Sequence, residues 1–191
     1  MNIQTITPPA VDAVSLADAK TRLSISDSAS DDNIQVYIKA ATQEAENYLE
    51  RRLITQTVEL SLSGFEDCIL LPAGPVQSVT HVKYRDGDNA EQTLDSDVYE
   101  LQSGNDRTPD HLRLAFNKSW PTTSGRHNAV IIRYDVGWGL AADLPIKIQQ
   151  ALMLLVGHWL RFQKEAESGL GPSRIPRQFY DLLNSYRIQS F

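Results

Sequence analysis

The sequence has one cysteine, no long apolar run and no excess of positive charge, and each absence excludes a class of protein. Cys68 is the single cysteine, so no internal disulfide can form and a reducing compartment is expected. The longest helical apolar run, residues 151–156, is far too short to cross a bilayer. The formal net charge of -6 argues against a bulk electrostatic grip on nucleic acid or on an anionic membrane. The first ten residues lack a signal-peptide pattern, so we expect synthesis in the cytoplasm.

The longest helical pattern covers residues 142–167. Its apolar residues recur at spacings of three and four and predict one wide buried face, formed by Ile148, Leu152, Leu155, Trp159 and Phe162. Asp143 is the expected cap, and Pro145 suits the first turn, where a missing N–H costs nothing.

Three further helices are predicted. Ser15 and Asp18 form a plausible capping pair for a helix over residues 15–25, after an extended arm over residues 1–14. Ser30 or Asp31 is the expected cap of a second helix, which runs to about residue 52. A last helix is predicted from Ile175 to Tyr186, with Pro176 in its first turn.

Between the second and third helices the hydrophobic period changes from about 3.6 to 2. Residues 54–62 and 130–136 alternate apolar and polar side chains, and shorter strands are predicted near 69–71, 76–84, 92–94, 99–101 and 112–116. Several short strands at this spacing indicate an antiparallel sandwich or a barrel-like block. The predicted class is therefore α+β: a bundle of about four helices (1–53 and 140–191) with an inserted β domain at 54–139.

No catalytic, cofactor or metal site is predicted. The four histidines, His81, His111, His127 and His158, have no ligand spacing. Residues 86–91 begin like a calcium loop but carry Glu91 where glycine is needed, so a hairpin turn is the better interpretation. Ser124 and His127 are too close in sequence to face one another as nucleophile and base.

The acidic residues Glu44, Glu46 and Glu50 fall on the polar side of the second helix. They are expected to form a solvated face, or one side of a salt bridge between subunits. Trp120 and Trp138 stand at strand or loop ends, where such residues usually seal the edge of a β core but can also form a ligand platform.

Read together, these segments resemble the phage head–tail connector proteins, the head-completion or adaptor class, in the longer branch that carries a β insertion. The resemblance extends over about residues 14–187. It is carried by VSLADAKTRL (14–23), AATQEAENYLERRL (40–53), LPAGPVQSVTHVKYRDGDNAEQTL (71–94), VYEL (98–101), Trp120-Pro121, VIIRYDVGWG (130–139), LPIKIQQALMLLVGHWLR (144–161) and IPRQFYDLLNSYR (175–187).

The resemblance implies a structural protein of a tailed bacteriophage or prophage, placed in the virion at the head–tail junction and made in the bacterial cytoplasm. Its subunits would form a ring of twelve beneath the portal protein, extend the DNA channel without sequence-specific binding, and receive the next adaptor or tail-completion protein. In such rings helices make the subunit contacts, and a C-terminal segment, here residues 175–191, lies towards the portal.

These implications select two groups of candidate residues. The subunit-interface candidates are Tyr37, Ala41, Tyr48, His158 and Trp159, on the two long helices. The portal-docking candidates are Arg177, Tyr180, Tyr186 and Arg187. Three alternative functions stay open from the sequence: another virion or tail-completion protein, a carbohydrate- or peptide-binding β module, and a hydrolase with an unrecognised His/Asp pair.

Overall fold

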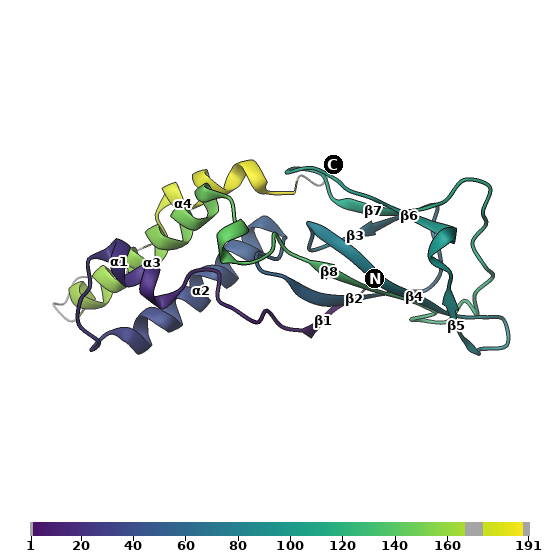
Figure 1. Cartoon of the computed structure of the whole chain (residues 1–191), viewed down its shortest axis with the longest axis horizontal. Coiled ribbons are helices and arrows are strands. Elements are labelled where there is room, and N and C mark those ends of the chain that lie inside the picture. Colours follow the sequence, from purple (N-terminus) through teal and green to yellow (C-terminus); the bar gives the residue numbers. More distant parts are fainter. Residues whose placement is uncertain (1, 167–173, 189–191) are drawn as a thin grey trace. The chain divides into compact units, whose positions relative to one another are not determined.

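The computed structural model describes residues 2–166 and 174–188 (Figure 1). The strands are β1 (Asn2–Thr7), β2 (Gln56–Leu62), β3 (Cys68–Leu71), β4 (Val76–Arg85), β5 (Glu91–Leu94), β6 (Tyr99–Gln102), β7 (Asp110–Leu114) and β8 (Val130–Val136). The α-helices are α1 (Leu16–Leu23), α2 (Asp31–Leu49), α3 (Ile146–Ala166) and α4 (Arg177–Leu183), and short 3₁₀ turns are η1 (Ser96–Val98), η2 (Ala141–Asp143) and η3 (Asn184–Tyr186). The predicted α+β class is confirmed.

The chain divides into two compact units. The β unit contains residues 2–10 and 55–138, and the helical unit contains residues 11–54, 139–166 and 174–187. The two units are described separately below.

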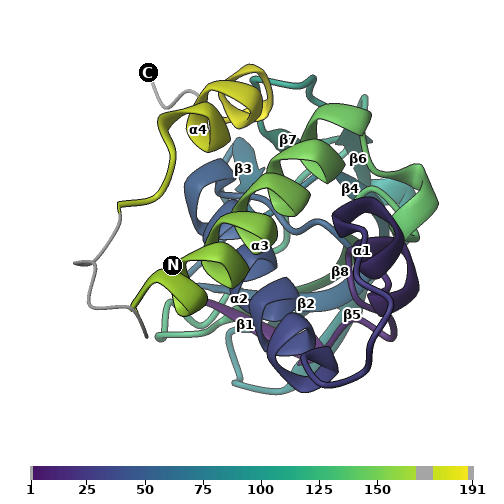
Figure 2. The ribbon, with the colours of Figure 1, turned by 90° about the vertical axis from the view of Figure 1, so that its left-hand side faces the viewer.

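In the helical unit, α3 lies against both α2 and α4 (Figure 2). The predicted apolar faces are confirmed: Ile34, Ile38 and Leu49 of α2 are buried, as are Ile148, Leu152 and Leu155 of α3. Burying one such aliphatic side chain contributes about 1.5–3 kcal/mol, so these faces supply much of the stability of the unit.

The N-cap residues are the predicted ones at α1 and α2 and differ from the prediction at α3 and α4. The Ser15 Oγ accepts a hydrogen bond from the Asp18 N–H at 3.0 Å, as expected for the capping pair of α1. Ser30 occupies the N-cap position of α2 without a side-chain hydrogen bond to the backbone. The Asp143 carboxylate accepts from the Leu140 N–H at 2.8 Å and therefore caps η2, because a 3₁₀ turn intervenes before α3. At α4, Pro176 precedes the helix rather than lying in its first turn.

The β unit holds two antiparallel sheets. One has the order β1-β2-β8-β4-β5 and the other the order β3-β7-β6. Every second residue of β2 and β8 is buried, as the alternation predicted. Both sheets contribute to one apolar cluster, with Leu60 and Ile132 from the first sheet and Ile69, Leu71 and Leu112 from the second.

One predicted boundary differs from the structure. Residues 1–53 were expected to belong to the helical domain, but Asn2–Thr7 forms a strand paired with β2. All six of its residues are exposed, so the strand carries no alternating burial that a sequence pattern would reveal. It lies at the edge of the larger sheet.

Candidate assembly surfaces

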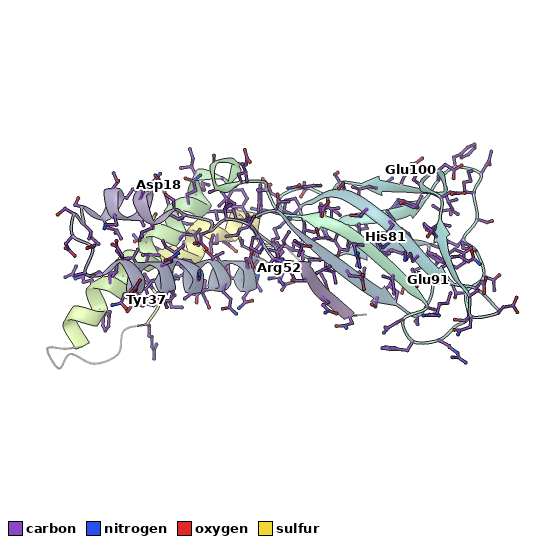
Figure 3. The ribbon with its side chains drawn as sticks, turned by 60° about the horizontal axis from the view of Figure 1, so that its bottom comes forward. Asp18, Tyr37, Arg52, His81, Glu91 and Glu100 are labelled. Carbon is purple, nitrogen blue, oxygen red and sulfur yellow. The ribbon has the colours of Figure 1, made fainter. Side chains whose placement is uncertain are left out.

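Tyr37 and Trp159, two of the interface candidates, contact each other within one subunit. Their ring centroids lie 5.9 Å apart at an interplanar angle of 50°, which joins α2 to α3. Figure 3 shows Tyr37 on α2. Both side chains remain half-buried, so part of each ring stays accessible for a further contact.

Ala41 does not fit the predicted role. Its side chain is completely buried in the helical unit. The small side chain lets a neighbouring element approach closely, and that element belongs to the same chain. We therefore leave Ala41 out of the candidate interface.

Tyr48 and Tyr180 form a second aromatic pair, between α2 and α4. Their centroids are 4.8 Å apart, and the Tyr180 hydroxyl donates a hydrogen bond to the Glu44 carboxylate at 3.0 Å. Burial, followed by the hydrogen bond and the charge of Glu44, raises the pKa of the Tyr180 phenol. The interface candidate Tyr48 and the docking candidate Tyr180 thus lie in one cluster.

Arg187 completes this cluster. Its guanidinium carbon lies 5.0 Å from the centroid of the Tyr48 ring, within the range of a cation–π interaction. Arg177, by contrast, has a side chain that is 93 % exposed, and it reaches Asp181 only at 4.0 Å. Tyr186 is half-buried in η3. Arg177 is therefore the docking candidate most accessible to another molecule.

His158 packs within the helical unit. Its ring lies 5.3 Å from the ring of Phe162, one turn further along α3. Its Nε2 atom is buried and has no hydrogen-bond partner among the described residues. The ring is half-buried in one subunit, so a contact with a neighbouring subunit stays a prediction.

The acidic residues of α2 do more than form a solvated face. Glu44 accepts the hydrogen bond from Tyr180, and the Glu46 carboxylate accepts from the Arg52 Nη1 at 3.0 Å and from the Leu53 N–H at 2.9 Å. Figure 3 marks Arg52 just beyond α2. These two carboxylates therefore fix α4 and the exit of α2, and of the three acidic residues only Glu50 is exposed.

The sequence offered two possible chemical sites, a calcium-like loop at residues 86–91 and the pair Ser124 and His127, and the structure can be compared with both. In residues 2–166 and 174–188 no group of three or more His, Cys, Asp or Glu side chains is arranged to hold a metal ion. The Ser124 Oγ is buried and has no hydrogen-bond partner among the described residues, so it is not paired with His127 as nucleophile and base. Both oxygens of the Asp86 carboxylate are used in the hairpin turn, by Ala90 and Gln92.

Trp120, one of the two aromatic residues at the strand ends, packs within the β unit. The Trp120 ring is stacked on Phe65, with centroids 4.7 Å apart and planes 2° apart, and it packs against the β core. Trp138 is half-buried.

Some exposed apolar side chains were not singled out by the sequence reasoning. Val36 is 61 % exposed, Leu140 62 %, Ile146 71 % and Phe116 87 %. The signal available in the sequence was weak: Val36 and Ile146 lie next to predicted apolar stripes and were not distinguished from them. Among the described residues, no helix combines the length and apolarity that crossing a membrane requires.

Comparison with known proteins agrees with the resemblance. Residues 13–119 match the model of a family described as phage gp6-like head-tail connector protein. No curated protein matches the sequence.

Solved structures similar to this chain include chains of gene transfer agent (GTA) particles. A chain in the neck of an empty GTA particle computed with C6 symmetry is 21 % identical, with a TM-score of 0.80. A chain in the virion of a native GTA particle is 20 % identical, with a TM-score of 0.81, and one in a native neck computed with C12 symmetry is 23 % identical, with a TM-score of 0.76. Each likeness covers 100 % of this chain and 97 % of the other.

Proposed function

The chain belongs to the phage gp6-like head-tail connector family, and from this membership we propose that its subunits form a ring beneath the portal of a tailed phage or prophage. The ring extends the DNA channel and receives the next adaptor or tail-completion protein. The observation that carries this proposal is the family match, because it spans α1, α2 and most of the strands. The β block, in this proposal, is a sandwich inserted into the helical bundle between α2 and α3.

We propose twelve subunits to the ring. Support comes from a solved neck with the same fold that was computed with C12 symmetry. A ring needs two different surfaces on each subunit, since the contact is heterologous and must close. For the helical unit we propose that Tyr37, Tyr48, His158 and Trp159 lie near these contacts, together with the exposed apolar residues Val36 and Ile146.

The C-terminal part of the helical unit is the proposed contact with the portal protein. Arg177 is the most exposed of the docking candidates, and Tyr180, Tyr186 and Arg187 accompany it on or after α4. The cluster of Tyr48, Tyr180 and Arg187 holds this segment against α2, so that its position is defined before a partner arrives.

The proposed role is structural, with no catalytic step. DNA passes through the ring without sequence-specific binding, and the net charge of -6 suits a passage in which phosphates must slide and not be held. The site of action is the head–tail junction of the virion, after synthesis in the bacterial cytoplasm. No membrane step is involved.

The test is the mass of the purified protein in solution, measured by light scattering after size exclusion, with and without the portal protein. A closed oligomer, or a monomer that becomes a ring on the portal, is the expected result. A monomer that stays monomeric beside the portal would contradict the proposal. Arg177→Glu, compared with Gln178→Glu at the next exposed position, tests whether the C-terminal segment makes the portal contact.

A further inference from the structure

The larger sheet of the β unit has two open sides. Its order, β1-β2-β8-β4-β5, leaves β1 and β5 each paired on one side only within the described residues. The open side of an edge strand presents unpaired N–H and C=O groups that can accept a strand from another chain. Folded proteins usually protect such edges with charged residues or proline.

The edges differ in this protection. β5 contains Glu91 and β6 contains Glu100, both exposed, and β3 directly follows the exposed pair Glu66 and Asp67. Two acidic edges from copies of this chain would repel one another. β1, with the sequence NIQTIT, has no charged residue and no proline. It is therefore the unprotected edge among the four that the described sheets present.

The side chains of β1 contribute little to the core of their own subunit. All six residues are exposed, and Ile3 and Ile6 are 37 % and 38 % exposed. An uncharged strand with exposed isoleucines is an aggregation hazard unless something covers it. The strand register with β2 is nevertheless well defined, from the pair Asn2–Ser61 to the pair Thr5–Val58.

The strand directions determine which contact between copies can form a ring. Each neighbouring pair in the sheet is antiparallel, so β1 and β5 run in the same direction. A contact of β1 with β1 would be two-fold and would stop at a dimer, whereas a contact of β1 with the opposite edge, β5, repeats head to tail. The neutral β1 edge also meets the acidic β5 edge without like-charge repulsion.

We propose that β1 of one subunit pairs in parallel with β5 of the next, so that the five-stranded sheets continue from subunit to subunit. The partner is a second copy of this chain, and the inference rests on the ring proposed above. The short β5, residues Glu91–Leu94, limits the pairing to about four residues, so this contact adds to the helical contacts and does not replace them.

Crosslinking between two different variants tests the pairing. Gln4 and Thr93 lie on the same face of the larger sheet. Gln4 pairs with Glu59 of β2, and Thr93 pairs with Lys83 of β4. Both β2 and β4 pair with β8, in registers that place Glu59 and Lys83 on one face. Tagged Gln4→Cys protein and untagged Thr93→Cys protein, both also carrying Cys68→Ser, are mixed, assembled and treated with a short bismaleimide. Gln4→Cys mixed with Gln102→Cys is the matched control, since Gln102 is an exposed residue of an edge strand in the other sheet.

The expected result is a tagged–untagged dimer at about tenfold the control yield, because pairing gives the two thiols a high effective concentration. Rings without this dimer would overturn the β1–β5 contact and leave the proposed ring intact. A chain that forms no ring, alone or with the portal, would refute both. Hydrogen exchange of the wild-type protein gives a second measurement: amides of residues 2–7 and 91–94 must gain protection when the ring forms, and unchanged protection there would also overturn the contact.

Discussion

The Tyr180 hydroxyl donates a hydrogen bond of 3.0 Å to the Glu44 carboxylate, although the two residues are 136 positions apart in the chain. This bond joins α4 to α2, so it links the segment proposed to meet the portal with one of the long helices proposed to build the ring. It lies beside the Tyr48 ring, which also contacts Arg187.

Tyr180→Phe should lower the free energy of unfolding by about 1 kcal/mol, because it removes one hydrogen bond and keeps the ring packing. Urea denaturation measures the change. Glu44→Ala, which removes the acceptor, and the double variant complete a cycle: the two effects should fall short of additivity by about 0.5 kcal/mol or more if the residues interact directly. Full additivity would show that the bond contributes nothing to stability.

In the β unit, the Asp110 carboxylate joins segments that are distant in the sequence. Its buried carboxylate accepts hydrogen bonds from the Val76 N–H at 2.9 Å and the Gly104 N–H at 2.8 Å. A Cβ atom at Gly74 would overlap the same carboxylate. Gly74→Ala should therefore displace Asp110 and cost about 2 kcal/mol or more, since the buried Val76 N–H and the part-buried Gly104 N–H lose their acceptor.

Gly87→Ala is the matched control for this substitution. A Cβ at Gly87, in the turn between β4 and β5, would meet nothing within 4 Å. Its effect on thermal stability should stay within about 0.5 kcal/mol, as for an ordinary surface change. Equal losses for the two variants would disprove the role given to Asp110.

The sequence predicted most helices and strands because their burial follows a period. The alternation of β2 and β8 and the three-and-four spacing of α3 each come directly from one buried face. β1 was missed as a strand because an edge strand with both faces exposed has no such period. Its identity depends on backbone pairing with residues 57–61, which a local pattern does not encode.

The roles of single polar residues were harder to predict for the same physical reason. Asp110 precedes an apolar alternation just as surface acids do, and only the fold brings Val76 and Gly104 to its carboxylate. Glu44 was expected on a solvated face, because its partner Tyr180 lies in a distant helix. By contrast, the absence of ligand spacing among the histidines could be read directly from the sequence.

The buried phenol of Tyr134 should make the free energy of unfolding depend on pH in the alkaline range. Burial, and secondarily the charge of Asp110, raises the pKa of its phenol, whose hydroxyl donates to the Pro72 carbonyl at 3.0 Å. Above the ordinary tyrosine pKa of about 10, the unfolded chain loses this proton and the folded chain keeps it, so stability falls as pH rises. Tyr134→Phe should reduce that slope by about 1.4 kcal/mol per pH unit, while costing about 1 kcal/mol at neutral pH.

Denaturation midpoints between pH 9 and pH 11 (roughly one unit either side of the reference phenol value) measure this slope. Tyr99 and Tyr180 also have raised pKa values, so the variant should keep part of the alkaline loss. An unchanged slope in Tyr134→Phe would mean that the Tyr134 phenol ionises in the folded protein as it does in the unfolded chain.

His81 gives the corresponding prediction on the acidic side. Partial burial, followed by the positive charges of Arg133 and Lys83, lowers the pKa of its imidazole below the ordinary histidine value of 6.5, and the charges of Glu59 and Glu91 oppose this shift. As pH falls through 6.5 the unfolded chain binds the proton first, so the contribution of His81 to stability is present above that pH and lost below it.

The titration of the His81 ring protons by NMR should show a midpoint below 6.5 in the wild-type protein. Arg133→Gln should move the midpoint upwards, because it removes one of the nearby positive charges. A midpoint at or above the ordinary histidine value in the wild-type protein would refute the prediction.

Val36 tests the proposed ring contact of the helical unit directly. Its side chain is 61 % exposed on α2, and an apolar residue so exposed contributes little to the fold of one subunit. Val36→Asp should leave the stability of the monomer within about 0.5 kcal/mol of the wild type, because no buried group is disturbed. If α2 contacts the neighbouring subunit there, the new carboxylate would be buried without a partner, and ring formation measured by light scattering should be lost.

Gln43→Asp, seven residues further along the same exposed side of α2, is the control for charge and helix propensity. Rings that form equally well with both variants would place the subunit contact elsewhere on the helical unit, with Ile146 the next residue to substitute.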